Sequence, residues 1–162
     1  MVDAPLKPLA LAPKIETLSL GGFDYGRPLG ELIDDGGFEG IHPDIKIPGR
    51  FRIFGNRCSQ EVQLVCFDRI LTFDEAIAEL DNLACRPAAL PEQLALAVKF
   101  KEAYQQGWIP ALDSIWHKSS EERLVPLLCA MELKGKPNQR TLTTYNCLRK
   151  FPSATRFAAV KL

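Results

Sequence analysis

The sequence predicts an α+β fold, because its strand-like and helix-like segments come in groups rather than in alternation. Two strand-like runs are followed by two amphipathic segments and then by three or four further strand-like runs. Alternating βαβ units would have indicated a parallel sheet instead. We therefore expect one antiparallel sheet of about five to six strands, covered by a two-helix hairpin, with an irregular Gly/Pro-rich N-terminal wrap.

The composition is that of an ordinary globular domain and excludes global disorder. The chain has 162 residues, of which 46% are hydrophobic and 25% charged. A chain of this length buries roughly 70% of its unfolded surface, which suffices for a core without disulfides or structural metal. It contains neither an apolar run of about 18 residues nor a basic start followed by an apolar stretch. We expect a cytoplasmic protein with no membrane span.

The first 49 residues differ from the rest in their glycine and proline content. They hold 8 of the 11 glycines and 6 of the 12 prolines. Proline fixes φ and removes a donor, while glycine adds backbone freedom, so regular structure is limited to a strand near 15–20 and a helical turn near 29–33. We interpret residues 1–49 as an irregular segment packed on a single α+β domain formed by residues 50–162.

The start of that domain predicts an antiparallel hairpin. Phe51 and Ile53 alternate with arginines, as in a half-buried strand. Residues 55–57 supply a turn, and the apolar run 62–67 is typical of a returning strand.

Two helices are expected next. Thr72 and Glu75 have the spacing of a capping box, and apolar residues then recur at steps of three and four as far as Pro87. Pro91 marks the first turn of a second helix, and Gly107 marks its end. These are the two helices of the expected hairpin.

The remaining extended runs lie at 108–116, 124–133, 140–145 and 156–162. Residues 134–139 form the turn between two of them. Because residues 127–131 are apolar throughout, we expect a central strand buried on both faces. Pro126 indicates that this strand begins at an edge or a bulge.

The cysteine pattern predicts free thiols rather than disulfides or a metal site. The five cysteines are Cys58, Cys66, Cys85, Cys129 and Cys147. Their number is odd, no two lie closer than eight residues, and no short Cys or His pair offers zinc ligands. Cys66 and Cys129 interrupt apolar runs, and we expect both to be buried.

Charge is distributed unevenly along the chain. Residues 134–162 carry seven basic side chains and no acidic one, which leaves 13 basic and 20 acidic side chains in residues 1–133. A surface built from this basic segment would attract an anionic partner, either an acidic protein or a nucleic acid. The candidate binding residues are Lys134, Lys136, Arg140, Arg149, Lys150 and Arg156. The first three are expected to form an exposed cluster at one hairpin.

Tyr145, Phe151 and Phe157 lie among these charges, as a base-stacking surface would need. The alternative is that the aromatic residues belong to the core. The basic residues would then pair within the fold with acidic clusters such as 34–35, 74–75 and 121–122.

Catalysis is the competing function class. A hydrolase or transferase would use His117 or Cys58 in a cleft, with Arg57 favouring the thiolate of Cys58. On one strand Asp113 and His117 would lie roughly 13 Å apart, too far for a hydrogen bond. No dinucleotide-binding or metalloprotease pattern occurs, so we expect no cofactor and favour binding over catalysis.

Overall fold

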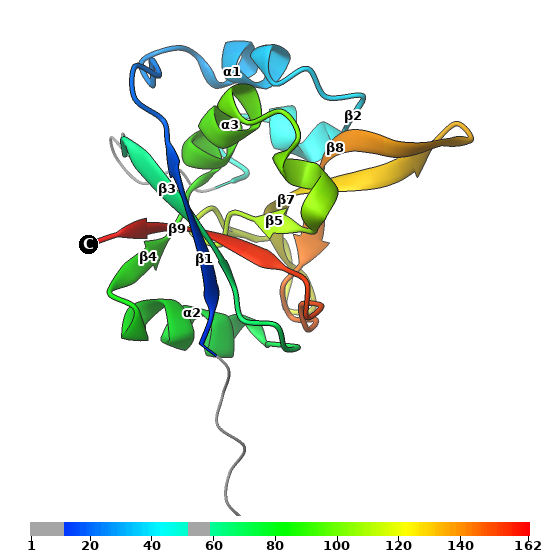
Figure 1. The fold of residues 1–162 in the computed structure, drawn as a ribbon. Coiled ribbons are helices and arrows are strands. Elements are labelled where there is room, and N and C mark those ends of the chain that lie inside the picture. The colour runs from blue at the N-terminus through cyan, green and yellow to red at the C-terminus, as the bar shows by residue number, and fades with distance from the viewer. Residues whose placement is uncertain (1–11, 52–58) are drawn as a thin grey trace, which may run out of the picture.

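A computed structural model describes residues 12–51 and 59–162 of the chain (Figure 1). Most of the predicted strand at 50–54, the turn at 55–57 and Cys58 lie outside the described residues. Arg50 and Phe51, which are described, form a bend rather than a strand.

The fold class is α+β, as predicted, but the expected single sheet is wrong because the strands form two sheets. The first is antiparallel, in the order β1 (Lys14–Ser19), β3 (Glu61–Cys66), β9 (Arg156–Lys161) and β4 (Cys85–Pro87). The second runs β2 (Gly40–Ile41), β8 (Lys136–Asn146), β7 (Arg123–Leu133) and β5 (Ile109–Pro110), with β6 (Trp116–His117) also paired to β7. It is mixed because β2 is parallel to β8.

The chain changes sheets between β8 and β9. Instead of continuing beside β8, β9 pairs with β3 and β4. There Phe157 and Ala159 pack into one hydrophobic cluster, and Ala158 packs into another. A strand that is buried on both faces is favoured in the interior of a sheet. Strand β9 accordingly lies between β3 and β4 in the first sheet, and not beside β8 at the edge of the second.

The structure contains three α-helices within the described residues: α1 (Leu29–Asp35), α2 (Phe73–Asn82) and α3 (Leu90–Lys99). Two short 3₁₀ helices, η1 (Pro43–Lys46) and η2 (Ala103–Gln106), complete the helical content there. The second predicted helix is shorter than expected, since it ends at Lys99 and η2 follows it.

The predicted two-helix hairpin is wrong, because α2 and α3 cover opposite faces of the first sheet (Figure 1). Ala76 and Leu80 of α2 share a cluster with Val65, whereas Leu96 of α3 shares one with Leu64. Neighbouring residues of a strand point to opposite faces, so the two helices lie on the two sides of β3. Strand β4 connects them.

The first third of the chain is more regular than expected. The short strand and the helical turn are confirmed as β1 and α1. Residues 12–49 also supply β2, so this segment adds a strand to each sheet.

The interpretation of residues 127–131 is partly wrong. Leu127, Leu128 and Cys129 are buried in a central strand, but Met131 is 41% exposed because β7 extends beyond its partner β5. Pro126 lies at neither an edge nor a bulge. It faces the gap between β5 and β6, where its carbonyl accepts from Ala111 and no backbone donor is needed.

The four described cysteines are free thiols, and Cys85, Cys129 and Cys147 are buried. The prediction that Cys66 is buried is wrong, because this residue is partly exposed at the end of β3. None of the helices within the described residues is both long and apolar enough to cross a membrane.

The capping box of α2 is confirmed. The Thr72 hydroxyl accepts a hydrogen bond from the Glu75 N–H at 3.2 Å, and the Glu75 carboxylate accepts one from the Thr72 N–H at 2.9 Å. We expect Thr72→Ala to lower the free energy of unfolding by about 1 kcal/mol. Thr17→Ala, on the exposed edge strand, should change it by less than about 0.5 kcal/mol. Chemical denaturation of both variants checks this, and equal midpoints would show that the cap contributes nothing.

Candidate functional site

Arg140, one of the six predicted binding residues, lies inside the fold. Arg140 is only 6% exposed, so the prediction that Lys134, Lys136 and Arg140 form one exposed cluster is wrong. Its Nη1 donates to the carbonyls of Ala97 at 3.2 Å and Lys101 at 3.1 Å, and its Nη2 donates to those of Gly36 and Gly37. These carbonyls lie at the C-terminal ends of α3 and α1, where helices leave acceptors unpaired and carry partial negative charge.

The buried charge of Arg140 is compensated without an ion pair. No described carboxylate bonds to the guanidinium, which instead lies 5.5 Å from the centre of the Phe38 ring. The Glu39 carboxylate accepts the backbone N–H of Arg140. The alternative that basic residues of 134–162 are paired within the fold therefore holds for Arg140. Its partners are backbone carbonyls, however, and not the acidic clusters that were expected.

Arg156 is also largely buried, with 10% of its side chain exposed. Its Nη2 donates to the Ala103 carbonyl, and its Nη1 lies 3.5 Å from the Gln106 side-chain oxygen. Burial lowers the pKa of this guanidinium, and the charge of Glu16 opposes the shift. Arg156 therefore joins β9 to η2, and only a small part of its side chain reaches the surface.

The other four predicted residues are exposed, at two separate places. Lys134 and Lys136 lie at the β7–β8 turn, whereas Arg149 and Lys150 lie in the connection from β8 to β9. Lys136 is the first of the 11 residues of β8, and Arg149 and Lys150 follow its last residue, so the two pairs lie roughly 34 Å or more apart along the strand. The six residues thus do not form one surface.

The expected base-stacking surface is absent from this part of the chain, since Phe151 and Phe157 are buried in the core. Tyr145 is partly buried against Trp108 and Phe151. Its hydroxyl donates to the Lys150 carbonyl.

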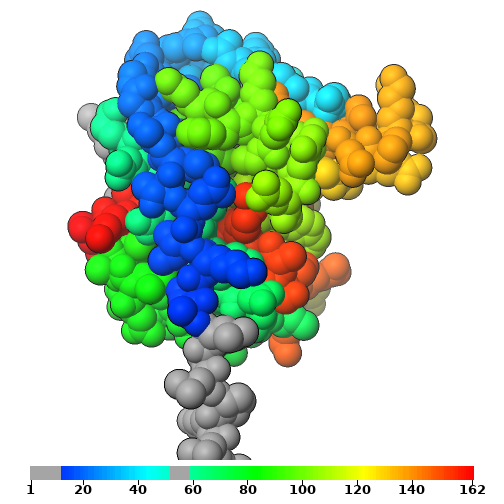
Figure 2. Space-filling model, viewed as in Figure 1, coloured from blue at the N-terminus to red at the C-terminus, as the bar shows by residue number. Residues whose placement is uncertain are grey.

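The β7–β8 turn stands at the end of a projecting hairpin (Figures 1 and 2). We define the arm as residues 131–139. Within the described residues, β5 pairs with β7 no further than Leu128, and β2 reaches β8 only at 141–142, so no described strand covers either edge of the arm. Lys134 and Gly135 have φ of 50° and 76°, the left-handed values that a tight two-residue turn needs.

The arm is anchored at its base. The Tyr104 hydroxyl of η2 donates to the Asn138 carbonyl at 3.3 Å, and Arg140 follows directly in the body of the protein. The arm carries Glu132, Lys134 and Lys136, and no described acidic group forms an ion pair with either lysine. Its geometry thus presents two lysines without an ion pair to any described residue, on a ribbon whose outer edges pair with no described strand.

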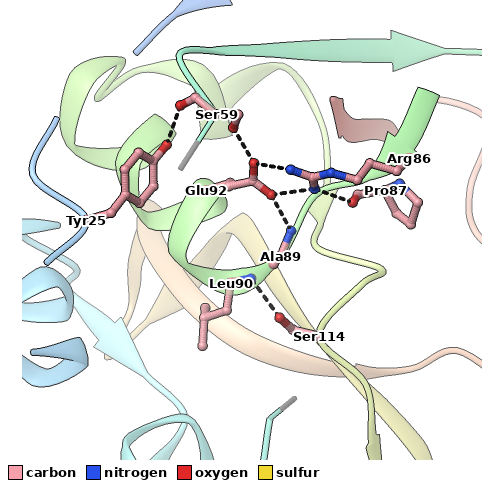
Figure 3. A network of polar contacts seen from close by, with 8 residues as sticks. All are labelled: Tyr25, Ser59, Arg86, Pro87, Ala89, Leu90, Glu92 and Ser114. Atoms are coloured by element: carbon pink, nitrogen blue, oxygen red, sulfur yellow. Dashed lines mark hydrogen bonds and ion pairs between the residues drawn. The ribbon is translucent and has the colours of Figure 1, made fainter. Parts of the chain in front are cut away.

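A second polar cluster, at the start of α3, was not anticipated from the sequence (Figure 3). The buried carboxylate of Glu92 accepts two hydrogen bonds from Arg86, at 2.8 and 2.9 Å, and one from the Ala89 N–H at 3.1 Å. The Ser59 hydroxyl donates to the same carboxylate. Glu92 is the third helical residue after the N-cap residue Ala89. In the sequence, a glutamate directly after Pro91 indicates such a capping position, but it does not indicate the partners Arg86 and Ser59.

The Glu92 cluster is a structural one. Burial raises the pKa of Glu92, but the hydrogen bonds from Arg86, Ser59 and Ala89 together outweigh it, and the pKa lies below its ordinary value. A catalytic acid or base near neutral pH would need the opposite shift. Every oxygen of this carboxylate already has a partner inside the fold.

The catalytic alternative gains no geometric support. His117 is exposed on β6, and no side chain of the described residues bonds to it. The run 108–116 is not a continuous strand, because β5 ends at Pro110 and β6 begins at Trp116. Cys58 lies outside the described residues. No group of three metal-ligating side chains occurs in residues 12–51 and 59–162.

We expect Arg140→Met to destabilise the fold by about 3 kcal/mol or more, because several buried carbonyls at two helix ends would lose their donor. Lys136→Met, an exposed substitution on the same strand, should change stability by less than about 0.5 kcal/mol. Urea unfolding of the two variants checks the prediction. Equal stabilities would contradict the internal role of Arg140.

Glu92→Gln should lower stability at pH 7 by about 3 kcal/mol, because it leaves Arg86 without its charged partner. The folded-state pKa of Glu92 lies below 4.5, so the wild-type contribution is present above that pH and is lost as pH falls through the folded-state pKa. The stability difference between wild type and variant should therefore shrink on acidification. Denaturation between pH 7 and 3 measures it, and a constant difference would argue against the ionised pair.

Comparison of the chain with models of protein families, with curated proteins and with solved structures finds no significant match.

Proposed function

We propose that the protein acts by binding, and that the arm docks an acidic segment of a partner protein. The observation that carries this proposal is the contrast within one strand: Arg140 is bonded inside the fold, while Lys134 and Lys136 project from it unpaired by any described acidic group. Two cations at the end of a projecting ribbon favour an anionic partner.

The open edges of the arm support a polypeptide partner. Strand β7 of the arm has an edge whose backbone donors and acceptors face away from β8, whereas the pairing is irregular opposite Met131–Leu133 and Tyr104 already bonds to the Asn138 carbonyl of β8. An extended peptide can add a strand to such an edge, with main-chain hydrogen bonds giving affinity and side chains giving specificity. The lysines would then pair with carboxylates of the added strand.

The charge distribution favours an acidic protein over a nucleic acid. A nucleic-acid site neutralises about 6–10 phosphates in a typical case, whereas the arm has two lysines and one glutamate. Arg149 and Lys150 lie at the far end of β8, and the aromatic residues of the segment are core residues. A short acidic strand needs fewer cationic contacts than a nucleic acid, and the two lysines of the arm can supply them.

The test uses a synthetic extended peptide of alternating Glu and Val, with wild-type protein at low and moderate salt. Lys134→Glu/Lys136→Glu should abolish binding by repulsion. Arg149→Glu/Lys150→Glu makes the same charge change at the other end of β8, and this matched control should retain binding. A peptide with alternate backbone nitrogens methylated should bind at least about tenfold more weakly, because strand pairing is blocked.

Fluorescence anisotropy of the labelled peptides measures these affinities. Single-stranded and duplex oligonucleotides are titrated in parallel. Binding of an oligonucleotide with no binding of the acidic peptide would replace the proposal with a nucleic-acid function. No binding of either probe at low salt would contradict an anion-docking arm.

A further inference from the structure

An open groove lies on the face of the first sheet that α3 covers only in part. Two adjoining cavities, of about 310 and 440 Å³, share Glu16, Leu64, Gln106 and Arg156. We name them together the β9 groove. Helix α3 ends at Lys99, and the short helix η2 follows it. Ala103 and Gln106 of η2 line one wall of the groove. Volumes of this size are typical of small-molecule sites.

One row of three side chains crosses the groove. Cys66 on β3 is paired with Lys14 on β1 and with Arg156 on β9. Residues directly opposite in an antiparallel sheet point to the same face, and all three line the larger cavity. The partly exposed thiol of Cys66 therefore lies between two cationic side chains.

Arg156 lines both cavities of the groove, and its charge is not fully compensated there. Its side chain is 10% exposed, and its buried Nε has no hydrogen-bond partner within the described residues. The nearest carboxylate, Glu16, is itself 58% exposed and lies 3.8 Å from Nη1, longer than a hydrogen bond. A ligand carboxylate at the exposed part of the guanidinium would add a charge-assisted contact that Glu16 does not supply.

Acidic groups balance the cations of the groove. Glu16 and Asp68 face Lys14 and Arg156 in the larger cavity, and Glu102 lies beside Lys101 in the smaller one. A purely anionic ligand would meet repulsion from these carboxylates. A zwitterion can place its carboxylate against Arg156 or Lys14 and its ammonium against Glu16 or Asp68.

We propose that the β9 groove binds a small zwitterionic disulfide, formed from an amino-acid-like or peptide thiol, and that Cys66 reacts with it. The Cys66 thiol releases its proton to water, and the thiolate attacks one sulfur of the bound disulfide. A bond forms between Cys66 and that sulfur as the S–S bond of the reagent breaks. Cys66 is oxidised to a mixed disulfide, and the departing sulfur leaves as a reduced thiolate.

Cys66 is the thiol suited to this exchange among the described cysteines. Burial raises the pKa of Cys129 and of Cys147 to about 11, and it also raises the pKa of Cys85. The Cys66 thiol has only a weak hydrogen bond, to the Ser153 carbonyl at 3.6 Å. The other three described thiols are buried, so Cys66 is the one that a disulfide bound in the groove can reach.

The test measures the rate at which three disulfides modify folded protein: cystine, which is zwitterionic, cystamine, which is cationic, and dithiodipropionate, which is anionic. Mass spectrometry of digests assigns the mixed disulfide to Cys66. Each rate is divided by the rate for the same cysteine in urea-unfolded protein, which removes the intrinsic reactivity of the reagent. We expect the normalised rate for cystine to exceed the other two at least about fivefold.

Lys14→Gln and Glu16→Gln are both exposed edge-strand substitutions, and each should reduce the preference for cystine to less than about twofold. Lys161→Gln, at the other end of β9, is the matched control and should retain the preference. Equal normalised rates for the three reagents, or a preference unaffected by both groove variants, would overturn the proposal. So would modification of another cysteine while Cys66 stays unmodified.

Discussion

The buried guanidinium of Arg140 is the interaction on which the arrangement of the second sheet depends. From one position on β8 it donates to carbonyls at the ends of α1 and α3, and so joins two helices and a strand that are distant in sequence. Its charge is compensated by helix C-termini and by the face of Phe38 rather than by a carboxylate. This link also holds the base of the arm against the body, so that only residues beyond it project.

Arg140 also helps to explain why the seven basic residues of 134–162 do not form one basic surface in the folded protein. Arg140 and Arg156 have nearby sequence neighbours that are basic, yet both donate to backbone carbonyls inside the fold. Four of the remaining five basic residues are divided between the two ends of β8, and Lys161 lies at the end of β9. A net charge of +7 over 29 residues thus becomes two small exposed pairs and one separate exposed lysine. We therefore expect local electrostatic contacts at the arm, and not the extended field that nucleic-acid binding requires.

The open groove has a different origin, in the way the first sheet is covered. Helix α2 packs on one face of this sheet and α3 on the other, but the row of Lys14, Cys66 and Arg156 belongs to neither hydrophobic cluster and lines the groove instead. The end of α3 lies at the opposite end of β1, where the Lys99 side chain donates to the Gly21 carbonyl. The arm and the β9 groove are therefore independent features, one on each sheet.

The sequence by itself determined the local features: the α+β class, the capping box at Thr72, the strand β1, the place of the β7–β8 turn and the burial of Cys129. The predicted length of that turn is wrong, because β8 begins at Lys136 and residues 136–139 are strand instead of turn. These local features follow from capping, periodicity and turn preferences, which act between residues close in the chain. Tertiary structure alone decided the division into two sheets, the opposite placement of α2 and α3, and the burial of Arg140. A basic side chain in an alternating strand pattern has the same local signature whether it meets solvent or the carbonyls of two distant helix ends. The partners of Arg140 lie about 40 and 100 residues away, beyond the range of any local sequence preference.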